Sequence, residues 1–304
     1  MISRILVTGS SGTIGTRLCE ALLAKKYDIV GVDWKHNKWN KDVENITIIG
    51  DLRDKKTFDK LPKDFDLIIH LAANAMVYNS VMEPDLAFDN FITAYNTLEF
   101  ARKSGIKKFM FASSREVYGN TTKTILKEEE AHIVNCESPY AASKIGGESL
   151  SRAYHRCYGL EFVIFRFSNV YGMYDDSDRV IPLFIRRCRE GKDIIVFGED
   201  KMLDFTYIDD TITGVITCIE SFDRIKNDTI NIAYGEGSSI LKIAELIKSH
   251  FNSKSKVILK NVRTGEVVKY TADIGKIRNI GFTPKINIHE GIHKSIEWYN
   301  KHSK

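Results

Sequence analysis

Cysteine is scarce in this sequence and is not arranged for disulfides or metal. The five cysteines are odd in number and scattered, without the paired spacing of a zinc site; they are Cys19, Cys136, Cys157, Cys188 and Cys218. We therefore expect reduced thiols, no bound metal and a cytoplasmic protein.

Long apolar runs are also absent. No apolar stretch approaches the ~20 residues that span a bilayer, and residues 1–4 lead directly into a short apolar segment rather than a signal sequence. Internal repeats, low-complexity segments and flexible linkers are lacking. The formal net charge of +4 is too small to indicate nucleic-acid binding, although it is compatible with an anionic small substrate. We expect neither a membrane nor a nucleic acid as a partner.

What the sequence does contain is the composition of an ordinary globular protein. Apolar residues make up 43% and charged residues 28% of the chain. At 304 residues the chain is long enough for a large core and for two domains.

A glycine-rich turn lies near the beginning of the chain. The apolar strand Ile5–Val7 is followed by Thr8-Gly9-Ser10-Ser11-Gly12-Thr13-Ile14-Gly15 and a helix to about Lys25. Such a turn lets backbone amides approach a pyrophosphate and points a helix N-terminus at its charge. The spacing G-x-x-G-x-x-G is weak by itself, because an ordinary tight turn can have the same pattern.

The next strand strengthens the dinucleotide hypothesis. Residues 28–33 form an apolar strand that ends on Asp33, 18 residues after Gly15. A carboxylate there accepts hydrogen bonds from the adenosine ribose and repels a 2′-phosphate, so Asp33 favours NAD over NADP. Lys35 and His36 are nearby cations that could tolerate the phosphate.

Apolar strands alternate with helices through the first half of the chain. Further buried strands are expected over residues 46–50, 67–73, 107–114 and 160–167, with a helix over residues 85–105. This alternation indicates a parallel sheet covered on both faces, with its ligand crevice beyond the carboxyl ends of the strands.

Several side chains at these strand ends are candidate ligand contacts. Asp51 and Leu52 follow the third strand, where they could lie against an adenine edge. Ala72 and Ala73 at the end of the fourth are small enough for a ligand to approach closely.

Two polar residues in this region admit a structural interpretation. His70 is expected to be a core histidine with its hydrogen bonds satisfied. Asn90, in the first half of the 85–105 helix, either bridges water to the active site or is simply solvated.

The candidate catalytic groups lie between residues 109 and 144. A buried strand ends at Ser114, and Ser138 and Pro139 have the positions of a helix cap and first helical residue. Tyr140 and Lys144 then share one helical face, where an ammonium is expected to lower the pKa of the phenol toward neutrality. Tyr140 is therefore a candidate acid/base, with Ser114 orienting the same substrate oxygen. The Tyr-x-x-x-Lys spacing alone is weak, since about one is expected by chance.

Taken in order, the motifs resemble the extended short-chain dehydrogenase/reductases, and within them the NAD-dependent nucleotide-sugar epimerase/dehydratase branch, UDP-glucose/galactose 4-epimerase-like. The resemblance covers nearly the whole chain and rests on the glycine turn, Asp33, Asp51-Leu52-Arg53, His70-Leu71-Ala72-Ala73, Ser114, Val117-Tyr118-Gly119 and Tyr140-x-x-x-Lys144.

The resemblance implies an α/β fold with a Rossmann-type doubly wound parallel sheet and a smaller α/β C-terminal substrate domain. Residues 1–172 would form the NAD-binding domain, with returning segments from the second half, and residues 173–304 the nucleotide-sugar domain. A homodimer, paired through the helices that carry Asn90 and Tyr140, is implied in the same way.

Site residues also follow from the resemblance, position by position. The catalytic residues would be Ser114, Tyr140, Lys144 and Glu116. The NAD contacts would be Gly9, Gly12, Thr13, Ile14, Gly15, Asp33, Asp51, Leu52, Leu71, Ala72, Ala73, Asn90, Tyr140 and Lys144. The substrate contacts would be Ser114, Asn169 near the pyrophosphate, Val196 and Phe197 against the uracil, and Arg263 on a phosphate.

Two neighbouring residues bear on which reaction is catalysed. Arg115 stands where 4,6-dehydratases carry an Asp, and a guanidinium cannot protonate a leaving group. Glu116 matches the Glu of dehydratases and decarboxylases. It would either abstract a sugar C5 proton or pair with Arg115, and we favour the pairing.

Two positions bear on which substrate is bound. Leu203 stands where the family has a phosphate-binding Arg, so Lys201 or Arg179 would substitute, or Arg263 would hold the phosphate alone. Tyr270 matches a position where a bulky side chain disfavours N-acetylated sugars.

The resemblance therefore implies a nucleotide-sugar 4-epimerase, with a UDP-sugar as expected substrate. Tyr140 would take the C4 hydroxyl proton while hydride passes to tightly bound NAD, and the 4-keto sugar would turn over and take the hydride back. The alternatives are a nucleotide-sugar decarboxylase or dehydratase, a 4-keto-sugar reductase and, more remotely, a non-catalytic NAD-binding sensor.

Overall fold

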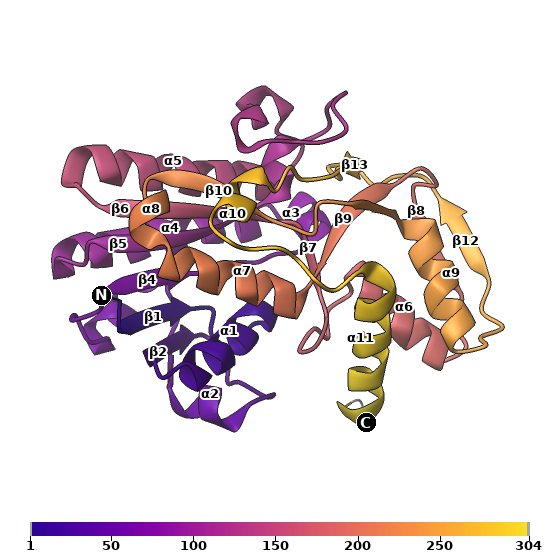
Figure 1. Cartoon of the computed structure of the whole chain (residues 1–304), viewed down its shortest axis with the longest axis horizontal. Coiled ribbons are helices and arrows are strands. Elements are labelled where there is room, and N and C mark those ends of the chain that lie inside the picture. The colour runs from indigo at the N-terminus through magenta and orange to yellow at the C-terminus, as the bar shows by residue number, and fades with distance from the viewer. Residues whose placement is uncertain (1, 303–304) are drawn as a thin grey trace.

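The computed structural model describes residues 2–302 and is built around a seven-stranded parallel sheet (Figure 1). Its strand order is β10-β6-β5-β4-β1-β2-β3. The strands are β1 Arg4–Thr8, β2 Asp28–Asp33, β3 Thr47–Ile49, β4 Leu67–His70, β5 Lys108–Ser114, β6 Glu161–Phe167 and β10 Asp228–Ile232. The accompanying helices are α1 Thr13–Ala24, α2 Lys41–Asn45, α3 Val77–Met82, α4 Asp85–Ser104, α5 Pro139–Tyr158, α7 Ile208–Glu220 and α8 Phe222–Ile225, with 3₁₀ turns η1 Lys55–Lys60, η2 Arg115–Tyr118, η3 Glu128–Glu130 and η4 Ile133–Asn135.

Apolar side chains cover both faces of the main sheet. Along β1, Ile5 and Val7 pack with Leu18 of α1, whereas Leu6 packs on the opposite face with Leu98 of α4. Helices α1 and α7 contribute to the first of these two cores, and α4 and α5 to the second. Burial on both faces explains the near-continuous apolar strands of the sequence and confirms the predicted doubly wound sheet.

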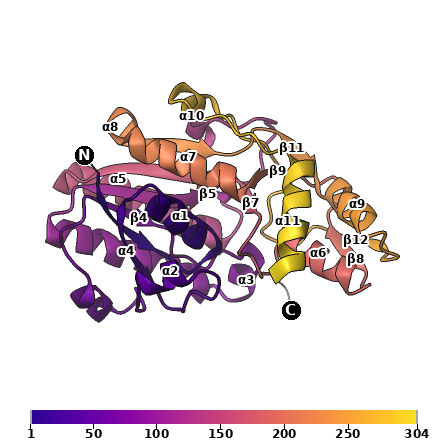
Figure 2. The same ribbon diagram turned by 60° about the horizontal axis from the view of Figure 1, so that its bottom comes forward.

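The second half of the chain adds smaller sheets at one side of the molecule (Figure 2). In these, β9 pairs with β7, β11 and β13, while β8 pairs with β12. The elements are β7 Asn169–Tyr171, α6 Val180–Arg189, β8 Ile194–Phe197, β9 Met202–Tyr207, β11 Gly237–Ser239, α9 Ile240–His250, β12 Val257–Lys260, β13 Lys269–Tyr270, α10 Gly275–Asn279 and α11 Ile288–His302. Strand β10 returns to the main sheet beside β6. A domain division at residue 172 stays a prediction.

The strand register brings the candidate site residues to one edge of the main sheet. His70 lies opposite both Thr8 and Phe111, and Ser114 lies opposite Phe167. The segments that follow β1, β4 and β5 therefore emerge side by side at the carboxyl edge.

Strand β4 is shorter than the sequence predicts, ending at His70 rather than at residue 73. Its neighbour β1 ends at Thr8, and the chain turns at Gly9 with a φ of 73°. A Cβ on Gly9 would lie only 2.8 Å from the backbone nitrogen of Ala72, so the chain after His70 packs closely against the turn, and Leu71 N still donates a hydrogen bond to the Thr8 oxygen at 3.2 Å. Between residues 2 and 302, no helix combines the length and apolar character needed to cross a bilayer.

Candidate active site

A cavity of about 730 Å³ lies along the carboxyl edge of the main sheet. The first half of the chain contributes the glycine turn, the ends of β2 and β5, and the loops after β3 and β4. The second half contributes residues of β7, β8 and β9 and the segment 174–184. An extended crevice at this edge is where doubly wound folds bind dinucleotides.

The glycine turn has the close backbone packing of a pyrophosphate cradle. A Cβ on Gly15 would lie 2.0 Å from the carbonyl oxygen of Gly9, and one on Gly12 would lie 3.3 Å from the same oxygen. Helix α1 begins immediately after Gly12 and directs its N-terminal amides toward the cavity edge. Thr13 and Ile14 also line the cavity, so the turn fits the phosphates of a dinucleotide.

Asp33 is held in place at the end of β2. Its carboxylate accepts hydrogen bonds from the backbone amides of Ser11, at 3.0 Å, and Lys35, at 2.9 Å. Burial raises the pKa of Asp33, and these backbone bonds oppose that effect. The Lys35 and His36 side chains are exposed, whereas Asp33 is buried beside the cavity.

Asp51 and Leu52 also line the cavity, as predicted for the adenine end. Arg53 pairs with the Asp51 carboxylate at 2.6 Å and lowers its pKa. Arg53 also contacts Asp89 at 2.8 Å, so one guanidinium is shared by two carboxylates.

Asn90 is buried, so its interpretation as a solvated side chain is wrong. Its side chain accepts a hydrogen bond from the backbone nitrogen of Asn74 at 2.7 Å and donates one to the Asn74 oxygen at 3.1 Å. These bonds fix the cavity-lining loop that contains Leu71, Ala72 and Ala73.

Helix α5 presents the candidate acid/base as the sequence predicts. The Ser138 hydroxyl caps it by accepting a hydrogen bond from the backbone nitrogen of Ala141 at 3.1 Å, with Pro139 in the first turn. Tyr140 and Lys144 are both buried in the cavity wall. Lys144 Nζ donates to the Ala112 oxygen at 2.8 Å and lies 5.7 Å from the Tyr140 ring centroid.

The predicted lowering of the Tyr140 pKa by Lys144 is wrong. Burial raises the pKa of Tyr140, opposed by the Ser114 hydroxyl and by the charges of Arg179 and Arg115. Burial also lowers the pKa of Lys144 to about 8. Desolvating the Tyr140 phenolate and the Lys144 ammonium costs more free energy than the attraction that their four-residue spacing predicts.

Glu116 forms an ion pair with Arg115, which is the interpretation that we favour from the sequence. Arg115 Nη2 lies 2.6 Å from Glu116 Oε1, and both side chains are buried. Burial raises the pKa of Glu116, while Arg115 and Lys201 act in the opposite direction. Asn169 holds the pair from the other side, since its Oδ1 accepts from Arg115 Nε at 3.2 Å and its Nδ2 donates to the Asp204 oxygen at 2.8 Å.

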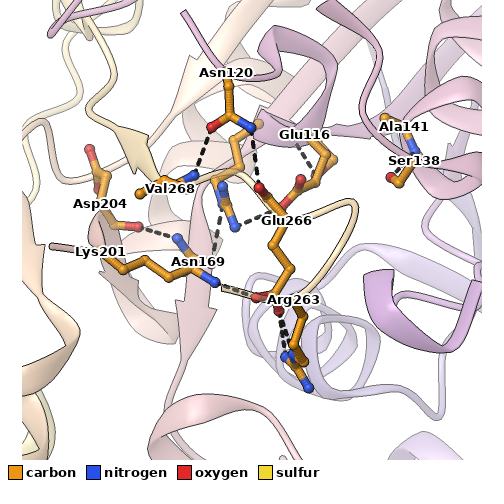
Figure 3. Close-up of polar contacts among 12 residues, drawn as sticks. Glu116, Asn120, Ser138, Ala141, Asn169, Lys201, Asp204, Arg263, Glu266 and Val268 are labelled. Carbon is orange, nitrogen blue, oxygen red and sulfur yellow. Dashed lines mark hydrogen bonds and ion pairs between the residues drawn. The ribbon is translucent and has the colours of Figure 1, made fainter. Parts of the chain in front are cut away.

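A second group of charges lies at the end of the cavity formed by the second half of the chain. Figure 3 shows contacts running from Lys201 through Glu266 to Arg263. Lys201 Nζ lies 2.9 Å from Glu266 Oε2, and Arg263 Nε donates to Glu266 Oε1 at 3.0 Å. Leu203 is buried beside them, and Lys201 lines the cavity from the segment just before β9.

Of the two residues predicted to contact the uracil, Phe197 lines the cavity and Val196 does not. Phe197 lines the cavity under the Arg263 guanidinium, 4.7 Å from its ring centroid. Val196 is fully buried in the core, because successive side chains of β8 point in opposite directions, and Ile195 lines the cavity instead. Counting two residues back from Phe197 would have identified Ile195.

Other cavity residues were missed by the sequence analysis. Tyr78 also contacts Arg263, whose guanidinium lies 4.7 Å from the Tyr78 ring centroid. Trp39 and Tyr174 line the dinucleotide end. These three come from loops or the short helix α3 and lack a spacing signal that would have singled them out. Tyr270 is buried outside the cavity lining, so a direct contact with an N-acetyl group is not supported.

The chain has close relatives in sequence and structure. A model of the NAD dependent epimerase/dehydratase family matches residues 5–233. A putative UDP-glucose 4-epimerase of Methanocaldococcus jannaschii is 34% identical over 309 residues, and a UDP-N-acetyl-alpha-D-glucosaminuronate decarboxylase of Bacillus cytotoxicus is 30% identical over 322; each alignment covers 99% of both chains. The crystal structure of UDP-glucose 4-epimerase from Thermotoga maritima with UDP-glucose has a TM-score of 0.90 at 28% identity, covering 99% of this chain and 100% of that one.

Proposed function

The chain belongs to the NAD-dependent epimerase/dehydratase family, and from that premise we propose that it is a UDP-sugar 4-epimerase that works through a transient 4-keto sugar. Its relatives include enzymes named for epimerisation and for decarboxylation of UDP-sugars. One observation favours epimerisation: the residue after Ser114 is Arg115, paired with Glu116 at 2.6 Å, where dehydration needs an acid.

The cavity residues fit the NAD that this family uses. Those that would hold it are Gly9, Gly12, Thr13, Ile14 and Gly15 at the phosphates, Asp33 at the ribose, Asp51 and Leu52 at the adenine, and Leu71, Ala72, Ala73, Tyr140 and Lys144 along the rest of the cofactor. Bound NAD supplies a nicotinamide that accepts a hydride from the sugar C4 and returns it. Asn90 acts on this site indirectly, by fixing the loop at Asn74.

Tyr140 is the group that moves the proton. As a phenolate it accepts the C4 hydroxyl proton, and as a phenol it gives the proton back, while Ser114 donates a hydrogen bond to the same oxygen. Because burial raises the pKa of Tyr140, the phenolate needs positive charge nearby. Arg179 and Arg115 act in this direction, and Lys144 Nζ lies 5.7 Å from the Tyr140 ring centroid.

The substrate end of the cavity suits a nucleotide diphosphate. Arg263 and Lys201 are two cations within reach of one pyrophosphate, and Lys201 replaces the Arg that is absent at Leu203. Phe197 and Ile195 offer an apolar surface for a flat base. Asn169, which also lines the cavity, holds Arg115 beside the sugar.

A second candidate is decarboxylation or dehydration of the 4-keto sugar. Glu116 favours it, since its buried carboxylate keeps one oxygen without a partner among the described residues. A 4-keto-sugar reductase would use the same Ser114, Tyr140 and Lys144, whereas a non-catalytic sensor would have no need of them.

The test is to incubate the protein, without added cofactor, with a panel of nucleotide sugars and to weigh the products. Unchanged mass with altered sugar stereochemistry supports epimerisation; loss of water or carbon dioxide selects the second candidate. We expect Tyr140→Phe to lower kcat by about 10²–10⁴-fold, the usual worth of a general acid/base. Unchanged turnover in this variant would show that the catalytic assignment is wrong.

A further inference from the structure

Among the cavity-lining residues, buried polar atoms of Ser11, Arg115, Glu116 and Tyr171 lack hydrogen-bond partners within residues 2–302, and two of these atoms belong to adjacent residues. They are Nη1 of Arg115, a donor, and Oε2 of Glu116, an acceptor. The other atoms of these side chains are engaged, since Arg115 uses Nη2 for Glu116 and Nε for Asn169. Unsatisfied buried polar atoms are costly, so such a pair in a cavity wall points to a ligand that completes it.

The position of the pair relates it to the reacting centre. Arg115 and Glu116 directly follow Ser114 in η2, and the Ser114 hydroxyl accepts a hydrogen bond from the Glu116 backbone nitrogen at 3.2 Å. Ser114, Arg115, Glu116 and Tyr140 all line the same cavity. A group bound beside the oxygen that Ser114 and Tyr140 hold is therefore the nearest partner for the two atoms.

A hydroxyl group matches the two atoms better than a carboxylate does. One hydroxyl can accept from Arg115 Nη1 and donate to Glu116 Oε2 at the same time. A carboxylate could accept from Arg115, but it would add a second buried negative charge beside Glu116, which is costly.

We propose that Arg115 and Glu116 together recognise one neutral hydroxyl of the sugar, at a carbon near C4, and so select hydroxylated over deoxygenated and acidic sugars. This inference rests on the proposed function for the identity of the ligand. It assigns the ion pair a role in specificity that is separate from the chemistry at Tyr140. The hydroxyl is at C3 or C6, and the two are distinguished by the test.

The test measures binding, so that its result does not depend on turnover. NAD-loaded protein is titrated in a calorimeter with UDP-glucose, its 3-deoxy and 6-deoxy analogues and UDP-glucuronate. We expect one deoxy analogue and UDP-glucuronate to bind more weakly than UDP-glucose by on the order of tenfold to a hundredfold, the usual cost of losing a hydrogen bond to a charged group.

Three variants test whether the difference in affinity between UDP-glucose and the deoxy analogue arises from the Arg115–Glu116 pair. Arg115→Met and Glu116→Gln should each reduce the gap between UDP-glucose and that deoxy analogue, and the double variant should reduce it no further. Arg263→Met is the matched control: it should weaken all four ligands equally and leave the gap intact. Glu116→Gln conserves shape, so it decides the question if Arg115→Met fails to fold, as judged by thermal unfolding.

The inference is overturned if wild-type protein binds the four sugars equally, if UDP-glucuronate binds most tightly, if the gap survives in Glu116→Gln, or if UDP-glucose does not bind. One further result would distinguish the specificity inference from the proposed function. If the gap depends on the pair but UDP-glucose is not epimerised, the proposed function fails and the specificity role stands.

Discussion

His70 shows how burial sets the ionisation state of a single residue in this molecule. Its Nδ1 lies 2.9 Å from Thr8 Oγ1, and its ring stacks on Phe109 and Phe111. Burial, with a smaller effect of the Lys144 charge, lowers the pKa of His70 to about 3. The prediction of a core histidine is confirmed, and the residue is neutral in the folded protein near neutral pH.

This neutrality predicts a loss of stability in mild acid. Unfolded His70 titrates near 6.5 and the folded residue near 3, so the unfolded state binds more protons between these values and stability falls as the pH drops below about 6.5. Between pH 7 and pH 5, wild-type protein should lose about 2 kcal/mol more than His70→Phe. Urea unfolding of both proteins at both pH values measures this, and equal losses would contradict it.

At the scale of elements, the turn between β1 and α1 is the part least able to accept side chains. Gly15 and Gly12 both face the Gly9 carbonyl oxygen, but an added Cβ would lie 2.0 Å from it at Gly15 and 3.3 Å at Gly12. The first distance requires the turn to move, whereas the second requires a shift of a few tenths of an ångström. The two glycines therefore form a matched pair for testing the cradle.

We predict that Gly15→Ala weakens NAD binding at least tenfold, because the displaced turn no longer directs its amides at the pyrophosphate. Gly12→Ala should have a clearly smaller effect. Calorimetric titration of each variant with NAD measures the difference, with thermal unfolding to check that both are folded. Equal affinities in the two variants would argue against the cradle.

Element positions were largely predictable because strands of a doubly wound sheet are buried on both faces and read as apolar runs. Strand β2 matches its predicted bounds, and α4 ends one residue before Gly105, whose φ of 74° suits glycine. The family resemblance, the fold class and NAD as cofactor are confirmed. The roles of individual site residues stay predictions.

The features of the site that could not be predicted from the sequence depend on contacts between segments far apart in the chain. Val196 was chosen by position, but the pleat of β8 turns Ile195 to the cavity. The pKa of Tyr140 was misjudged because spacing along a helix contains no information on desolvation. The Lys201–Glu266 contact joins residues 65 apart, and a single sequence gives no sign of such a pairing.

At the scale of the whole molecule, helix α4 carries an uncovered apolar stripe. Phe88 is 63% exposed, and Ile92 and Tyr95 follow at helical spacing and are only partly buried. The stripe lies on one of the two helices through which a homodimer is expected, and two such surfaces could bury one another. The homodimer itself stays a prediction.

We predict that Phe88→Glu shifts the protein from dimer to monomer, since it places a charge at the centre of the stripe. Sedimentation velocity at several concentrations measures the change. Leu259→Glu on β12, where the native side chain is 44% exposed, is the control and should leave the assembly unchanged. A wild-type monomer, or a dimer unaffected by Phe88→Glu, would rule out pairing through this stripe.

The return of β10 to the main sheet has a consequence for how the chain can be divided. Because β10 covers the open side of β6 over five paired residues, a polypeptide stopping at residue 172 would expose a fresh row of amide and carbonyl groups. It would also lose α7, whose apolar side chains cover the same sheet face as α1. The 1–172 fragment would tend to self-associate through this unpaired strand edge. Residues up to 232 must therefore be synthesised before the parallel sheet that binds the cofactor is complete.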